Sequence, residues 1–119
     1  MRKHNDLCGL EGRTLTGVRK SEDGERLVLS FDDGDETWEA EGDCCANAWV
    51  ESINIMATLP AVITGREERE LDAQEDHPDH EVLDVCFYSL RTSTGHVDIE
   101  LRVGHNGYYG GWLVHLDKP

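Results

Sequence analysis

Apolar and polar residues alternate along much of this chain with the two-residue period of half-buried β-strands. The clearest case is 97–103, where Val97, Ile99, Leu101 and Val103 alternate with charged residues. The other segments that predict strands are 14–20, 26–32, 36–41, 62–64, 82–90 and 112–116. Because both faces of 82–90 are apolar, we expect this strand to lie in the centre of a sheet.

Turn signals separate these segments and indicate antiparallel neighbours. Asp33-Gly34 and Asn106-Gly107 are dipeptides typical of tight hairpin turns. Gly24 supplies the positive φ that a turn at 21–24 requires. The first third of the chain therefore predicts a three-stranded meander with an acidic outer face.

Residues 44–56 depart from this pattern and predict a helix. Cys45, Trp49 and Ile53 recur at helical spacing. Asp43 is a suitable N-cap residue, because its carboxylate can accept hydrogen bonds from the first turn. We therefore expect an α+β domain, in which a single twisted antiparallel sheet of about six strands has one helix packed on one face.

The length of 119 residues predicts a single domain over 1–119. Residues 72–81 contain no large apolar side chain and predict a mobile acidic loop. No stretch approaches the roughly 18 apolar residues of a membrane span, and no signal peptide is evident. We therefore expect a cytoplasmic protein that does not bind membranes and whose cysteines are reduced thiols.

The formal net charge of −14 adds a functional constraint. Such a charge repels nucleic acid and attracts basic surfaces, so we expect no direct nucleic-acid binding. Acidic runs usually form a solvated face, but carboxylates held in rows on a rigid sheet can imitate a phosphate backbone. The acids expected to contact a basic partner are Asp32, Asp33, Asp35, Glu36, Glu39 and Glu41, with Glu75, Asp76 and Asp79 as a second patch.

Two features could carry chemistry. Cys44 and Cys45 would lie at a helix N-terminus, which lowers a thiol pKa, although a buried cysteine is often only a small apolar residue. His77 and His80 lie among acids and are weak candidates for metal ligands. No Cys–His pair with a local signature and no Cys-x-x-Cys motif accompanies them. We therefore expect no catalytic residue, no metal and no cofactor.

Residues 104–112 are rich in glycine and aromatic residues. Tyr108 and Tyr109 could stack on a base or a sugar. The same segment is also explained by a turn at Asn106-Gly107 followed by a bulge at Gly110-Gly111. Both interpretations stay open. The glycine-rich nucleotide-binding patterns and the nucleophile-elbow pattern do not occur in the sequence.

Four blocks resemble a family of small, uncharacterised proteins of bacteriophages and of bacteria such as actinomycetes. They are Gly-Arg-Thr-Leu at 12–15, Phe-Asp-Asp-Gly at 31–34, the Gly-Asp-Cys-Cys…Trp-x-Glu block at 42–53 and Asn-Gly-Tyr-Tyr-Gly-Gly at 106–111. The resemblance implies a phage or mobile-element setting in the cytoplasm of a bacterial host, and it implies no activity. Small acidic phage proteins are often inhibitors of host defence, including anti-CRISPR proteins.

Together these observations lead to one functional hypothesis and two alternatives. We expect a non-enzymatic interaction protein that binds a basic, nucleic-acid-binding surface of a bacterial protein and blocks it. The first alternative is a small-molecule or metal-binding module built on Cys44-Cys45 and Tyr108-Tyr109, and the second is a hydrolase or thiol enzyme. Free strand edges would also allow two copies to pair as a homodimer.

Overall fold

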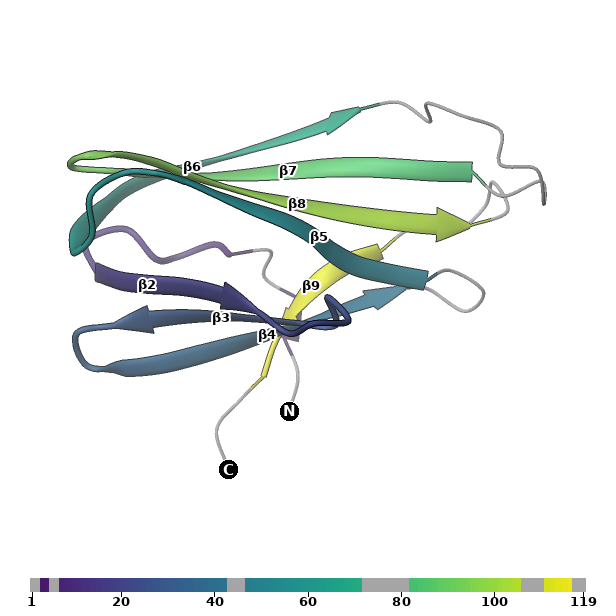
Figure 1. The fold of residues 1–119 in the computed structure, drawn as a ribbon, viewed down its shortest axis with the longest axis horizontal. Helices are drawn as coiled ribbons and strands as arrows, with labels where there is room; N and C mark the ends of the chain where they lie inside the picture. Colours follow the sequence, from purple (N-terminus) through teal and green to yellow (C-terminus); the bar gives the residue numbers. More distant parts are fainter. Residues whose placement is uncertain (1–2, 5–6, 43–46, 72–81, 106–110, 117–119) are drawn as a thin grey trace.

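The computed structural model describes residues 3–4, 7–42, 47–71, 82–105 and 111–116. Nine β-strands occur in this part of the chain, and no helix does (Figure 1). The strands are β1 (Lys3–His4), β2 (Thr14–Lys20), β3 (Arg26–Phe31), β4 (Gly34–Gly42), β5 (Asn47–Met56), β6 (Ala61–Leu71), β7 (Val82–Thr92), β8 (Gly95–His105) and β9 (Gly111–His115).

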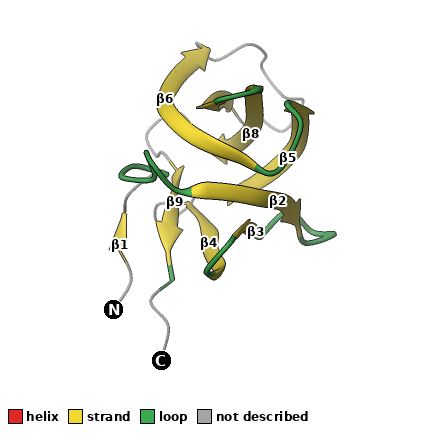
Figure 2. Cartoon of the chain, turned by 90° about the vertical axis from the view of Figure 1, so that its left-hand side faces the viewer, coloured by secondary structure: helices red, strands yellow, loops and turns green. Residues whose placement is uncertain are grey.

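All strand pairs are antiparallel, in the order β1-β9-β4-β3-β2-β6-β7-β8-β5. In the middle of this strand order the pairing is short, because β2 and β6 pair only through Thr14↔Val62 and Leu15↔Ala61. The strands therefore fold over at this junction into two layers. One layer contains β6, β7, β8 and β5, and it faces β2, β3, β4 and β9 (Figures 1 and 2).

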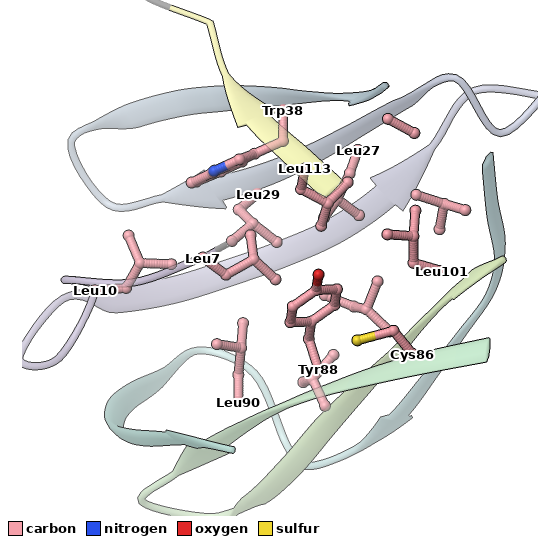
Figure 3. Close-up of a cluster of buried hydrophobic side chains, with 14 of the residues drawn as sticks. Leu7, Leu10, Leu27, Leu29, Trp38, Cys86, Tyr88, Leu90, Leu101 and Leu113 are labelled. Atoms are coloured by element: carbon pink, nitrogen blue, oxygen red, sulfur yellow. The ribbon is translucent and has the colours of Figure 1, made fainter. Parts of the chain in front are cut away.

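The core fills the space between these layers (Figure 3). Leu27 and Leu29 of β3 and Trp38 of β4 face Tyr88 of β7 and Leu101 of β8, and all five side chains are almost fully buried. Each such residue contributes about 1.5–3 kcal/mol to folding when it leaves water. The alternation read from the sequence thus places one face of β3, β4, β7 and β8 against the opposite layer.

The prediction of a helix at 44–56, and with it the α+β class, is wrong. Residues 47–56 form strand β5, which pairs with β8 along its whole length. The pairing shifts by one residue between Val50 and Ser52, so Glu51 is the extra residue of a β-bulge. The bulge brings Val50 and Ile53 to the same apolar face, and their spacing of three residues imitates a helix. Cys44 and Cys45 lie outside the described residues.

The other predicted strands are present, but the described residues form nine strands instead of about six, because β1 and β5 were not predicted as strands. Two further differences concern β6 and β9. The segment predicted as a short strand at 62–64 is β6, which extends from Ala61 to Leu71. In β9 the buried side chains are Leu113 and Val114, whereas Trp112 is only half-buried. The central position predicted for 82–90 is confirmed, because β7 pairs with β6 and β8.

The turn between β2 and β3 contacts the other layer through its backbone. The amide of Val50 donates a hydrogen bond of 2.7 Å to the carbonyl of Gly24. Gly24 has a φ of +75°, and a Cβ atom there would lie 2.5 Å from the Val50 carbonyl oxygen. Only glycine satisfies both conditions, so this turn is fixed against β5.

Replacing Gly24 tests this contact. We expect Gly24→Ala to lower the free energy of unfolding by about 2 kcal/mol or more, because it combines a strained φ with a backbone clash. Gly65→Ala is the matched control, since a Cβ atom at Gly65 meets nothing within 4 Å, and we expect a change of about 0.5 kcal/mol or less. Urea denaturation measures both values. Equal stability of the two variants would contradict the packed turn.

Candidate functional site

The acids predicted to bind a partner do not form one row in the structure. Asp32 and Asp33 lie in the turn between β3 and β4, and the other four lie on β4. Glu36 lies two residues from the buried Trp38, and therefore shares its inner face. Asp35, Glu39 and Glu41 alternate with these residues and occupy the outer face of the layer. The structure thus divides the predicted set between two faces and a turn.

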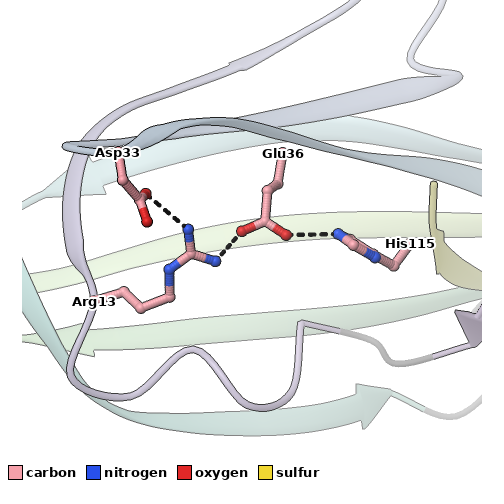
Figure 4. Close-up of polar contacts among 4 residues, drawn as sticks. All are labelled: Arg13, Asp33, Glu36 and His115. Atoms are coloured by element: carbon pink, nitrogen blue, oxygen red, sulfur yellow. Dashed lines mark hydrogen bonds and ion pairs between the residues drawn. The ribbon is translucent and has the colours of Figure 1, made fainter. Parts of the chain in front are cut away.

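Glu36 and Asp33 belong to an internal ion-pair network at the margin of the core (Figure 4). The Arg13 guanidinium contacts the Glu36 carboxylate and lies 3.0 Å from Asp33 Oδ1. The other Glu36 oxygen lies 2.7 Å from His115 Nε2. Arg13 also covers the ring of Phe31 at 3.9 Å. The network connects the segment before β2 with β4 and β9, so these two acids stabilise the fold.

On the outer face of the same layer, arginines from neighbouring strands compensate the acids. Arg19 Nη2 of β2 lies 3.1 Å from Asp35 Oδ2. Arg26 Nη2 of β3 lies 3.8 Å from Glu39 Oε2. Exposed pairs of this kind contribute little stability, but they lower the net charge of the face. The meander surface therefore offers fewer uncompensated carboxylates than its sequence predicts.

Uncompensated acids gather at one end of the molecule, in the turn between β2 and β3. This acidic turn comprises the exposed residues Glu22, Asp23 and Glu25, and none of the described arginines or lysines forms an ion pair with them. Asp23 accepts hydrogen bonds from the Ser21 hydroxyl at 2.7 Å and the Glu25 amide at 2.9 Å. These bonds lower the pKa of Asp23, the Ser21 bond most strongly. The carboxylate of Asp23 is therefore ionised throughout the physiological pH range.

The acidic turn borders a small hollow beside an aromatic ring. Asp23 and Glu25 line a cavity of about 330 Å³ together with Asn47, Ala48 and Trp49. Trp49 is half-buried, and its indole N–H donates a hydrogen bond of 3.0 Å to Glu51. Carboxylates next to an aromatic face form a site that attracts a lysine or arginine side chain.

A larger groove covers the outer face of β5, β8, β7 and β6, with a volume of about 850 Å³. Its side chains form rows across the strands, namely Ser52, Glu100, Phe87 and Arg69, then Asn54, Asp98, Ser89 and Glu67, then Met56, His96 and Arg91. Many of these groups contact one another. Asp98 accepts a hydrogen bond of 2.7 Å from Ser89, and Arg91 pairs with Glu67. The groove therefore carries both charge signs and is suited to a polar ligand.

Cys86 is the buried thiol of the described chain. Its Sγ atom lies 3.7 Å from Glu68 Oε1, and the donor atoms of Cys86, Glu68 and Glu70 lie within 4.8 Å of one another. Burial raises the pKa of the Cys86 thiol to about 12, and the two carboxylates act in the same direction. The thiol is therefore neutral at pH 7 and is a poor nucleophile.

Several predicted site residues lie outside the described part of the chain. These are Glu75, Asp76, Asp79, the metal candidates His77 and His80, the pair Cys44-Cys45 and the pair Tyr108-Tyr109. Strand β6 ends, and strand β7 begins, at the same end of the molecule as the acidic turn (Figure 1).

Sequence reasoning missed the hollow beside the acidic turn. The turn itself was evident from Gly24, but Trp49 was assigned to a helix. Only the pairing of β5 with β8, together with the Gly24–Val50 hydrogen bond, brings Trp49 next to Asp23 and Glu25. No local signal connects residues so far apart in the chain.

The fold and this surface define a small all-β protein with an acidic turn. The chain belongs to the family of the domain of unknown function DUF7448, whose model matches residues 9–114. No curated protein and no solved structure matched the chain. The described part contains no helix able to span a membrane.

The role of Glu36 in the ion-pair network can be tested by its removal. Its side chain is 18% exposed, whereas that of Asp35 is 51% exposed. We expect Glu36→Ala to cost about 1–3 kcal/mol of unfolding free energy, because it leaves Arg13 and His115 without their shared partner. Asp35→Ala, as the control, should cost about 0.5 kcal/mol or less. Denaturation curves that show the same loss for both would contradict a structural role for Glu36.

The raised pKa of Cys86 predicts selective alkylation. At pH 7 the native chain should react with iodoacetamide at the exposed Cys8, while Cys86 stays unmodified. In denaturant the Cys86 thiol is exposed and its pKa returns toward the ordinary value, so alkylation should follow. Peptide mass spectrometry distinguishes these sites. Modification of Cys86 in the native chain at the rate seen for Cys8 would contradict the buried, neutral thiol.

Proposed function

We propose that this protein is a non-enzymatic interaction protein that binds a basic, nucleic-acid-binding surface of a bacterial protein and blocks that surface. The hollow formed by Asp23, Glu25 and Trp49 is the observation that carries the proposal. It combines two carboxylates with an aromatic face, which is the chemistry that recognises lysine and arginine. The acidic turn would be the primary contact with the partner.

The charge distribution supports this choice of partner. The chain has a net charge of −14, and its described arginines are largely paired on the strands, such as Arg19 with Asp35 and Arg26 with Glu39. The acidic turn is left without such compensation. Because the net field of the chain attracts basic surfaces over long distances, it would accelerate the approach of a cationic partner.

We further propose that the protein acts in the cytoplasm of a bacterial host as a phage- or mobile-element-encoded inhibitor of host defence, in the manner of an anti-CRISPR nucleic-acid mimic. The support is the acidic composition and the resemblance of the blocks at 42–53 and 106–111 to phage and actinobacterial proteins. Membership in a family of unknown function is compatible with this role. No cofactor is required by it.

The experiment is an affinity capture from nuclease-treated bacterial lysate with the full chain as bait. Bound proteins are eluted with a salt gradient and identified by mass spectrometry. The proposal expects a stoichiometric nucleic-acid-binding protein that elutes at moderate salt, because salt screens exposed charges beyond about 8–10 Å. The captured protein must then lose its binding to nucleic acid in a gel-shift assay when the full chain is added.

Charge reversal at the acidic turn provides the specific prediction. We expect the double variant Glu22→Lys, Glu25→Lys to weaken partner binding at least tenfold, since each lost charge-assisted contact is worth about 1.5–3 kcal/mol. The double variant Glu11→Lys, Glu67→Lys is the control. It changes the net charge by the same amount, at exposed positions outside the acidic turn. Titration calorimetry with the identified partner gives both affinities.

Two outcomes would contradict the proposal. Equal loss in both double variants would show that only net charge matters, and not the acidic turn. If no basic protein is captured, the small-ligand hypothesis becomes the stronger one. The groove over β5, β8, β7 and β6 would then be the place to search for a ligand.

A further inference from the structure

Strand β5 is the last strand of the sheet and has one free edge. Its first half is covered, because Val50 donates its hydrogen bond to Gly24 in the acidic turn. Beyond the bulge, no hydrogen bond among the described residues connects the backbone of 52–56 to a strand other than β8. Such an edge is a template for another strand.

The chemistry of this edge is unlike that of the rest of the chain. Residues 52–65 contain no Asp, Glu, Lys or Arg, although 30% of the chain is charged. Two of the large hydrophobic side chains that are exposed in the described part of the molecule lie on this edge, namely Ile55 (43%) and Met56 (56%), and the third, Val62 (39%), lies on β6. The charges that natural proteins place on free edges to prevent pairing are therefore missing here.

The edge also lies away from the acidic turn along the same strand. The acidic turn contacts β5 at Val50, whereas Ile55 and Met56 are at the opposite end of that strand, which faces the viewer in Figure 2. The 52–56 edge itself carries no charged side chain, although Asp32 and Asp33 in the turn between β3 and β4 lie at the same end of the molecule (Figure 1). A second copy that approached this edge would keep the two acidic turns apart.

We propose that two copies of this chain form a homodimer by antiparallel pairing of their 52–56 edges about Asn54. In this register Ile53 of one copy faces Ile55 of the other, and Ser52 faces Met56. The isoleucine pairs extend the apolar face of β5, and the groove of each copy continues into that of its partner. Glu51 lies outside the paired segment.

Pairing about Asn54 keeps the two acidic turns of such a dimer apart. Val50 lies four residues from Asn54, or roughly 13 Å along a strand. The Val50 positions of the two copies would therefore be roughly 26 Å apart, more than twice the screening length of about 8–10 Å. A basic partner has the acidic turn as its better contact, whereas an uncharged self-complementary edge best fits a second copy.

The experiment measures the mass of the full chain in solution by sedimentation equilibrium over micromolar to millimolar concentrations. Because five residues per copy make a small interface, we expect a dimer that dissociates on dilution. Higher salt should strengthen dimerisation, because it screens the repulsion between the copies. Higher salt should instead weaken binding to a basic partner. The dimer and the partner complex can therefore be tested independently of each other.

Two substitutions locate the interface. Ile55→Lys introduces a charge at the edge, and we expect it to weaken dimerisation at least tenfold. Val62→Lys is the matched control, because Val62 is similarly exposed but its backbone is already paired with β2 and Ser93. Met56→Lys repeats the test on the other face of the edge, in case Ile55→Lys alters folding by circular dichroism. A monomer at all concentrations, or a dimer that survives both edge variants, would overturn the proposal.

Discussion

The hydrogen bond between the Val50 amide and the Gly24 carbonyl is the contact on which both candidate surfaces depend. It fixes the acidic turn of one layer against β5 of the other. Trp49 is thereby held beside Asp23 and Glu25, and these three residues line the hollow only in this arrangement. The same hydrogen bond occupies the outer edge of β5 at Val50, whereas the backbone of 52–56 forms no hydrogen bond with a described strand other than β8.

Charge is distributed unevenly over this fold, and the pairing of strands explains how. Where strands carry arginine and acid on neighbouring positions, as with Arg19 and Asp35, the charges meet across the sheet and compensate one another. The acids at 22–25 form no such ion pair with the described arginines and lysines. The edge of β5 carries neither sign. The acidic turn and the uncharged 52–56 edge therefore lie at different places along β5.

The acids on β4 show how a strand divides a run of similar residues. Glu36 points toward the core margin, where Arg13 and His115 satisfy both of its carboxylate oxygens. Asp35 and Glu39 point outward, because successive side chains of a strand lie on opposite faces. Acids that are close together in the sequence of β4 therefore lie on two different faces of the strand. The inward-facing acid, Glu36, stabilises the fold through Arg13 and His115.

The periodicity of the sequence determined where most strands lie, that β7 has a strand on each side, and that residues such as Trp38 and Leu101 are buried. Composition determined the strong negative charge. The strand at 47–56 was predicted as a helix from the four-residue spacing of Cys45, Trp49 and Ile53, and the bulge at Glu51 interrupts the two-residue period that would have indicated a strand. The hollow at Trp49, the partners of Glu36 and the free edge at 52–56 were decided by the tertiary structure alone, since each depends on contacts between segments distant in the chain.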